Sequence, residues 1–280
     1  MILLLQTIAV FWNVENFFDY RECSEISGCR WTASRFYDKA RGIGKIILSL
    51  SEGIEPPALV GLCEVDSKNS LYAISRSEVL EKWNYKFIHY DSPDPRGIDC
   101  ALLYRGCTPR CSESIPLTMG GKTVPSRTML KVEFDSLAVL VVHLPSKRGG
   151  SKEAARKRQR AVEMIDSIAS ASLLPLLVMG DFNEECGKQS PWSGDLKEIA
   201  GEGAGSIKFQ GRWEKIDRVL YRDSSGKHSV RCKSAALEVL LCPDKNYGGL
   251  KPLRTCSGPQ YCGGLSDHLP IRIEYDGVLE

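Results

Sequence analysis

The stretch Leu265-Ser-Asp-His-Leu-Pro-Ile-Arg-Ile-Glu-Tyr275 lies near the C-terminus and joins two reactive polar side chains to an apolar run. Apolar and polar residues alternate over 271–275, which predicts a half-buried β-strand. Asp267 and His268 precede this run, so a strand would hold a carboxylate and an imidazole at its end. A carboxylate can bind a metal ion, and an imidazole can move a proton or stabilise negative charge. An isolated Asp-His pair does not identify a catalytic site, so its meaning depends on the ends of the other strands.

The association of an apolar run with polar end groups recurs along the chain. Each such residue alone is usually a cap or a turn former, but five expected strands with polar ends are hard to treat as independent accidents. The groups are Asn13 and Glu15 after 7–13, Glu64 after 58–63, His143 at the end of 137–143, Asp181 and Asn183 after 173–180, and Asp267 with His268, to which Asp217 in 216–221 is added. Alternation along a strand places Asn13 and Glu15 on one side, facing one cleft.

These residue types together indicate metal-assisted chemistry. Carboxylates held close together repel one another unless a cation joins them. Oxygen ligands favour a hard ion, Mg²⁺ or Mn²⁺, over zinc. Such an ion, with amides and imidazoles, suits attack on a phosphoester, where charge on phosphoryl oxygens must be neutralised and a water activated.

Two helices and further strands complete the expected architecture. Apolar residues spaced by three and four predict helices over 34–50 and 151–170. Further strands are expected at 85–90, 98–104, 129–134 (a hairpin with 137–143) and 235–241, and long loops at 184–206 and 242–264. Loops on a rigid scaffold usually carry specificity. About nine or ten strands and three or four helices, without a long linker, predict one α/β domain over 1–280, with stacked sheets covered by helices.

The composition indicates a soluble protein without an overall preference for polyanions. The formal net charge of the 280 residues is only +2, so any surface for nucleic acid must be local. The apolar run 2–5 is too short to cross a bilayer, and no basic residue precedes it. We therefore expect a cytoplasmic monomer with no membrane span, or an extracytoplasmic protein if the start was trimmed from a longer precursor.

The cysteines are numerous but lack the spacing of a metal site. The chain has 11 cysteines and no Cys-x-x-Cys pair, which argues against zinc. Several lie in apolar runs, where a free thiol behaves as a small core residue. We expect mostly reduced cysteines, and the pair to test for a disulfide is Cys256 and Cys262, which flank a Gly-Pro turn.

Short segments spread over nearly the whole chain resemble, in order, the motifs of the endonuclease/exonuclease/phosphatase superfamily. They are Trp12-Asn-Val-Glu-Asn16, Gly61-Leu-Cys-Glu-Val65, Gly97-Ile-Asp-Cys-Ala-Leu-Leu-Tyr104, Val142-His-Leu-Pro-Ser146, Gly180-Asp-Phe-Asn183, Ile216-Asp217 and Ser266-Asp-His268. The superfamily includes pancreatic-type deoxyribonuclease, abasic-site endonucleases, inositol-polyphosphate phosphatases and sphingomyelinases. The stretches 89–97 and 143–150 are most similar to bacterial members whose substrates are generally unassigned. The resemblance implies a deoxyribonuclease I-like, four-layer α/β/β/α sandwich of two packed mixed sheets flanked by helices, with the site at one edge.

The resemblance also implies which residues bind the metal ion. Glu64 would be the principal ligand. Asp267 would support the metal or its water shell. Asn13 and Glu15 would lie nearby. The implied ion is Mg²⁺ or Mn²⁺.

The remaining motif residues would carry the chemistry. Asp181 would orient or deprotonate the attacking water, and Asn183 would donate to a phosphoryl oxygen. His268, oriented by Asp217, would act either as general base or as a transition-state donor, and the sequence does not choose between these roles. His143 would contact the non-bridging oxygens, at a place where some family members carry tyrosine.

Substrate binding is assigned to residues near the motifs. Arg96, Arg127 and Arg148 could bind phosphate bidentately or be solvated loop residues, and Asp99 begins the strand expected at 98–104. The basic side chains of the 151–170 helix either form an ordinary solvated face or attract a polyanionic substrate. They are Lys152, Arg156, Lys157, Arg158 and Arg160.

The sequence predicts a metal-dependent phosphoesterase, with a nuclease-type phosphodiesterase acting on DNA or RNA favoured by the arginines and the basic helix. A phosphatase of a small, sugar, inositol or lipid phosphate is the alternative. A catalytically inactive binding module that kept the fold is a third possibility. Such a module typically loses an acid, amide or imidazole position, and here all are present.

Overall fold

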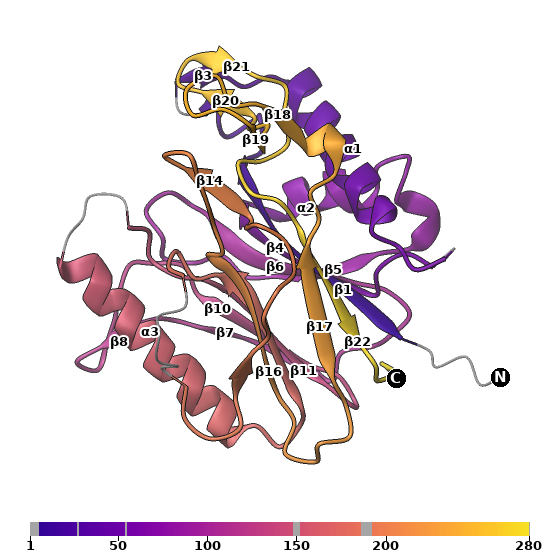
Figure 1. Ribbon diagram of the computed structural model, residues 1–280, viewed down its shortest axis with the longest axis vertical. Coiled ribbons are helices and arrows are strands. Elements are labelled where there is room, and N and C mark those ends of the chain that lie inside the picture. Colours follow the sequence, from indigo (N-terminus) through magenta and orange to yellow (C-terminus); the bar gives the residue numbers. More distant parts are fainter. Residues whose placement is uncertain (1–5, 27, 54, 148–151, 186–191, 280) are drawn as a thin grey trace.

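Two six-stranded β-sheets lie face to face, and helices cover both outer faces (Figure 1). The computed structural model describes residues 6–26, 28–53, 55–147, 152–185 and 192–279. The first sheet contains, in spatial order, β17 (Val230–Ser234), β22 (Ile271–Tyr275), β1 (Thr7–Phe17), β4 (Leu59–Val65), β6 (Asp99–Tyr104) and β5 (Lys86–His89). The second contains β13 (Lys197–Glu198), β16 (Asp217–Arg222), β12 (Leu176–Asp181), β11 (Ala138–His143), β10 (Met129–Glu133) and β7 (Cys111–Ile115). The predicted four-layer α/β/β/α sandwich is confirmed.

The outer layers are helical. Helices α1 (Ala33–Ser49) and α2 (Lys68–Ser75) pack on the first sheet, and α3 (Lys152–Ala171) packs on the second (Figure 1). The described chain also contains two short 3-10 helices, η1 (Glu81–Trp83) and η2 (Glu238–Leu240). Short strands outside the two large sheets pair two by two: β2 (Glu25–Ile26) with β3 (Cys29–Arg30), β8 (Thr118–Met119) with β9 (Lys122–Thr123), β14 (Ile207–Phe209) with β15 (Arg212–Glu214), β18 (Leu241–Pro243) with β19 (Leu250–Pro252), and β20 (Cys256–Ser257) with β21 (Gln260–Tyr261). No helix in the described part of the chain is long and apolar enough to cross a membrane.

The central strands are buried on both faces. In β1, Ala9 and Phe11 belong to the core between the sheets, whereas Val10 and Trp12 belong to the core beneath α1 and α2. All four are fully buried. The strand has no solvent face, which explains why its sequence is continuously apolar and does not alternate.

The register of the strands brings their polar ends to one edge of the sandwich. In the second sheet, parallel β11 and β12 place His143 opposite Asp181, and antiparallel β16 places Asp217 opposite Asp181. In the first sheet, parallel β1 and β4 place Asn13 beside the residue that precedes Glu64. The shared edge therefore collects polar groups from strands far apart in the sequence.

The apolar run 235–241 is not a strand, contrary to the prediction. On the side away from β1, β22 pairs with β17, which ends at Ser234, and residues 238–240 form η2. Ala235 and Leu240 are buried in the core beneath α1. A short apolar run that packs on a core has the same sequence pattern whether its backbone forms a strand or a turn, so the pattern does not distinguish the two.

Several other boundaries also differ from the prediction. Helix α2 and strand β7 were not predicted, and β12 begins at Leu176, not at Leu173, whose side chain is fully exposed. Helix α2 has only 8 residues, and β7 is the partly exposed edge strand of its sheet. Short elements of this kind carry little periodicity.

The disulfide joins a different pair of cysteines from the one that turn spacing indicated. Cys256 is bonded to Cys29, across a sequence separation of 227 residues, and Cys262 has a free thiol. The bond attaches hairpin β20–β21 to hairpin β2–β3. The expectation of reduced cysteines holds for eight others in the described chain, while Cys186 lies outside the described residues. A contact of this range depends on the fold and leaves no trace in local spacing.

Candidate active site

A cleft of about 930 Å³ opens at the edge where the polar strand ends meet. Its lining includes most of the predicted site residues, namely Asn13, Glu15, Glu64, Arg96, Arg127, His143, Asp181, Asn183, Asp267 and His268. Asp217 lies behind His268 and instead lines a separate cavity of about 480 Å³. That cavity contains no other predicted site residue from the described part of the chain. The larger cleft is therefore the candidate active site.

His268 and Asp217 form a hydrogen-bonded pair. His268 Nδ1 lies 2.7 Å from Asp217 Oδ2, and both side chains are nearly inaccessible to solvent. Ser266 fixes the approach of this segment, because its hydroxyl donates to the Asn13 carbonyl and accepts from the His268 amide. Burial alone lowers the pKa of His268, but the charge of Asp217 and its hydrogen bond outweigh burial and leave that pKa well above the usual value. The imidazole is therefore held as a cation with Nε2 available.

Asp181 lies between the two sheets and receives donors from both. Asn13 Nδ2 donates to its Oδ2 at 3.1 Å, and the Asn183 amide donates to its Oδ1 at 2.8 Å. Complete burial, followed by the charge of Asp217, raises the pKa of Asp181 to about 7, although His268 partly offsets this. A carboxyl with a pKa near 7 can both accept and release a proton at neutral pH.

Backbone strain is concentrated at the cleft. Glu15, Asn16 and Glu64 have φ angles of 47°, 47° and 64°, and Asn183 has 53°. The β1–β4 register shifts between Asn13 and the end of β1, and the β4–β6 register shifts around Glu64. Such bulges redirect side chains that a regular strand would turn elsewhere, and strain of this kind clusters at functional sites.

The donors at the cleft suit a hard divalent cation. Glu64 Oε2 accepts from the Asn16 amide at 2.9 Å, and Arg96 and His143 lie 3.9 Å and 4.0 Å from its carboxylate oxygens. Its oxygens therefore retain free lone pairs toward the cleft. The neighbouring thiol of Cys63 is fully buried, and burial raises the pKa of that thiol, so it is unsuited to binding metal. Carboxylate and amide oxygens remain as ligands, which is a set that Mg²⁺ or Mn²⁺ prefers.

Two cations that the sequence interpretation did not single out complete the acidic side of the cleft. Arg254 donates to Glu15 and Asp267, and Lys39 Nζ donates to the Glu15 carbonyl and to Thr255. Burial lowers the pKa of Lys39 to about 8. Burial and then the charge of Asp267 raise the pKa of Glu15, and the two cations offset part of this. Neither cation belongs to a motif, and no local signal would have identified them.

Two of the predicted arginines also line the cleft. Arg96 donates to Asn16 Oδ1 at 2.6 Å, and Arg127 lies 2.8 Å from His143 Nε2. Burial, and then the charge of Arg127, holds the pKa of His143 well below the usual value. Neutral His143 therefore accepts the hydrogen bond from Arg127 at Nε2. Arg148 lies outside the described residues.

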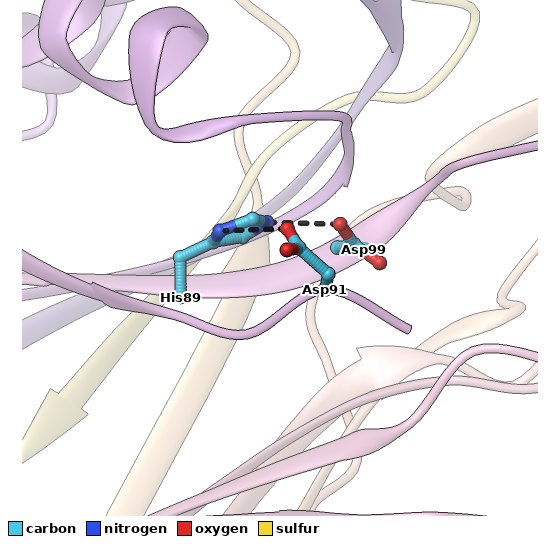
Figure 2. A group of neighbouring side chains, drawn as sticks. All are labelled: His89, Asp91 and Asp99. Carbon is cyan, nitrogen blue, oxygen red and sulfur yellow. Dashed lines mark hydrogen bonds and ion pairs between the residues drawn. The ribbon is translucent and has the colours of Figure 1, made fainter. Parts of the chain in front are cut away.

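Asp99 does not line the cleft, contrary to its assignment to substrate binding. Its carboxylate is buried, 2.9 Å from His89 Nε2, and it accepts from the Ser92 amide (Figure 2). Asp91 lies 3.9 Å from the other ring nitrogen of His89 (Figure 2), and each of the three side chains offers one ligand atom within 4.8 Å of the other two. Asp99 instead supports the loop that carries Arg96.

The basic face of α3 is largely neutralised. Lys157 pairs with Glu153, Arg158 with Glu184 and Arg160 with Glu163. Lys152 and Arg156 are exposed. The helix therefore presents a mixed surface and no continuous basic one.

Comparison with known proteins identifies the family and the fold of this chain. The model of the endonuclease/exonuclease/phosphatase family matches residues 7–276. A search of curated protein sequences finds no match. Zebrafish (D. rerio) TDP2 in complex with a single-strand DNA product has a TM-score of 0.62 at 15% identity, covering 97% of this chain and 99% of that one.

Two other solved structures show the same fold. The human Nocturnin catalytic domain has a TM-score of 0.60 at 17% identity, covering 96% of this chain and 93% of that one. The mannosyl-6-phosphatase of Bacteroides thetaiotaomicron has a TM-score of 0.60 at 16% identity, covering 96% and 99%. With a family model matching nearly the whole chain, the protein belongs to the endonuclease/exonuclease/phosphatase family, whose enzymes hydrolyse phosphoester bonds with the help of a divalent metal ion.

Proposed function

We propose that the protein is a Mg²⁺-dependent phosphodiesterase of the nuclease type, which cleaves its substrate by in-line attack of water. The observation that carries this proposal is that two titratable groups lining one cleft, Asp181 and His268, differ in their pKa values. Asp181 has a pKa near 7, while His268 is held as a cation. Groups whose environments separate their pKa values in this way serve as base and acid.

The residues have distinct roles in this mechanism. Asp181 orients the attacking water and accepts its proton, and the His268 imidazolium donates to a non-bridging phosphoryl oxygen. Arg96 and the side-chain amide of Asn183 bind the same phosphoryl group, the latter through the Nδ2 hydrogen that is not donated to the Leu144 carbonyl. Asp217 is a positioning residue, since it reaches the substrate only through His268. A divalent ion held by Glu64 supplies Lewis-acid stabilisation of the phosphoryl oxygens when bound.

The nuclease assignment rests on an aromatic side chain at the cleft. Phe209, on hairpin β14–β15, is 58% exposed although its ring is large and apolar, and Phe18, Ile26 and Ile207 line the same cleft. An exposed aromatic ring beside phosphate-binding groups is a platform on which a nucleobase can stack. TDP2 crystallised with a single-strand DNA product offers a structural precedent for this kind of ligand on this fold.

A phosphatase of a sugar phosphate is the second candidate. Glu25 and Glu214 also line the cleft. Their carboxylates would accept hydrogen bonds from sugar hydroxyls and repel a second phosphate. The mannosyl-6-phosphatase among the similar structures makes this chemistry a direct alternative.

A substrate panel separates the two candidates. We expect Mg²⁺-dependent cleavage of single-stranded DNA or RNA to exceed hydrolysis of sugar and inositol phosphates, with plasmid and abasic DNA as further arms. Phe209→Ala should lower kcat/KM on an oligonucleotide by about 10–100-fold, because stacking contributes about 1–3 kcal/mol per base, and Phe209→Tyr should retain it. Val239→Ala, at another exposed apolar residue that lies outside the cleft, is the control. Preference for a monoester over all nucleic acids would overturn the nuclease assignment.

The pH profile tests the roles of Asp181 and His268. Activity should rise as pH increases through about 7, when Asp181 loses its proton, and fall at higher pH, when His268 loses its own. A bound divalent cation would shift the acid limb of the pH profile to lower pH. In Asp217→Asn, both limbs should shift to lower pH, since the Asp217 charge raises both pKa values. Profiles of kcat/KM measured for the two proteins check this, and an unmoved alkaline limb would contradict the role given to His268.

A further inference from the structure

Arg254 occupies a position between two carboxylates at the cleft. Its Nη2 donates to Glu15 Oε1 at 2.9 Å and to Asp267 Oδ2 at 2.8 Å, and its Nε adds a second bond to Glu15 at 3.0 Å. A single nitrogen thus bridges two carboxylates, as a bound metal ion would. The side chain is 39% exposed, so it forms part of the cleft wall.

The segment that carries Arg254 is fixed at the next two residues. The Thr255 amide donates to Glu15 Oε2 at 2.7 Å, and Thr255 Oγ1 accepts from Lys39 Nζ at 2.6 Å. Cys256 is joined to Cys29 by the disulfide. These contacts hold the guanidinium in place although it comes from the short connection between β19 and β20 and not from a strand. Glu15 is therefore fully engaged, with Arg254 on one oxygen and the Thr255 amide on the other.

We propose that the Arg254 guanidinium takes the place of a second divalent cation in the acidic cluster, so that the protein binds one metal ion, at Glu64. The inference rests on the metal site of the proposed function. Glu15 and Asp267, which the family resemblance assigned to the metal side, both accept hydrogen bonds from the arginine, whose charge lies between them. The oxygens of Glu64 have no comparable side-chain donor within hydrogen-bond distance in the described chain. The positive charge beside Asp267 is then present at every metal concentration.

The consequence is a defined metal stoichiometry. The same two carboxylates would suit a hard divalent ion, so removal of the guanidinium would leave a competent pair of ligands. Arg254→Gln leaves Glu15 and Asp267 facing each other with no guanidinium between them, and the buried Lys39 is the cation that remains beside Glu15. Repulsion between like charges then favours binding of an ion there.

Mn²⁺ binding followed by electron paramagnetic resonance and by calorimetry tests the inference without an activity assay. The full-length wild type should bind one Mn²⁺ and Arg254→Gln should bind two. Arg254→Lys, which keeps the charge, should bind one, and so should Glu15→Gln/Arg254→Gln, which lacks one of the second ion's ligands. Lys251→Gln removes a positive charge from the adjacent strand β19, outside the cleft, and should behave as wild type.

The outcomes distinguish this inference from the proposed function. If Glu64→Gln has the same Mn²⁺ stoichiometry and affinity as wild type, the metal site itself is misplaced. If wild type binds one ion that requires Glu64 but Arg254→Gln also binds one, only the role of Arg254 is refuted. Two Mn²⁺ ions in wild type would refute it as well, and this measurement does not depend on how well any variant folds. A larger rise in Tm on adding Mn²⁺ to Arg254→Gln than to wild type would support the second ion.

Discussion

Alanine in place of His268 is expected to lower kcat by about 10³-fold, within the range found when a positioned donor or general acid is removed. The imidazole is held by Asp217 at 2.7 Å and its segment is fixed through Ser266, so its Nε2 is pre-positioned at the cleft. A donor that requires no reorganisation acts mainly on the transition state. We therefore expect kcat to fall far more than KM changes.

Hydrolysis of bis-p-nitrophenyl phosphate with Mg²⁺ or Mn²⁺ measures this loss. His228→Ala is the matched control, because His228 pairs with Asp276 beside Tyr275, at the strand ends remote from the cleft. Its kcat should equal that of wild type. If the rate of His268→Ala equals that of wild type, the catalytic role of His268 is wrong.

Glutamine in place of Glu64 is expected to remove the metal-dependent rate almost completely, by about 10³-fold, since Lewis-acid stabilisation of a phosphoryl group is worth several kcal/mol. Glutamine keeps the size of the side chain but has one neutral oxygen in place of a charged carboxylate. The Asn16 amide, which donates to Glu64 Oε2, would still find an acceptor, so folding should be little affected. The loss should therefore reflect weaker ion binding and not unfolding.

Metal titrations of activity distinguish this effect from a general defect. We expect the rate of Glu64→Gln to stay low as Mg²⁺ is raised far beyond what saturates wild type, with an unchanged Tm in the absence of metal. Glu238→Gln, an exposed glutamate on η2, removes the same charge outside the cleft and serves as control. Full recovery at high Mg²⁺ would show that other ligands hold the ion.

The elements with strong periodicity could be predicted, and the short ones could not. Strand β1 and helices α1 and α3 were placed to within a few residues, because burial on one or both faces requires apolar residues at regular positions in their sequences. The run 235–241 is apolar for another reason: it packs beneath α1 as a turn. An apolar run indicates that a segment is buried, but only a periodic pattern of apolar residues over a longer segment also indicates whether the segment is a helix or a strand.

The polar strand ends of the candidate site were visible in sequence because each borders an apolar run. Asp99 follows the same pattern, yet its carboxylate is turned to His89 beneath the loop. Which side of a strand end faces the cleft depends on bulges such as those at Glu15 and Glu64. These bulges arise from pairing with other strands, so sequence alone does not specify them.

The sequence by itself determined the fold class, the family and the ordered set of acids, amides and imidazoles, since these depend on local pattern and residue type. Only the tertiary structure decided what surrounds the Asp267-His268 pair. Arg254 reaches Glu15 across 239 residues, and Cys29 reaches Cys256 across 227. Contacts at such separations form because the sandwich closes β22 against β1 and brings the connections beyond them together. Their charges set the electrostatics of the cleft.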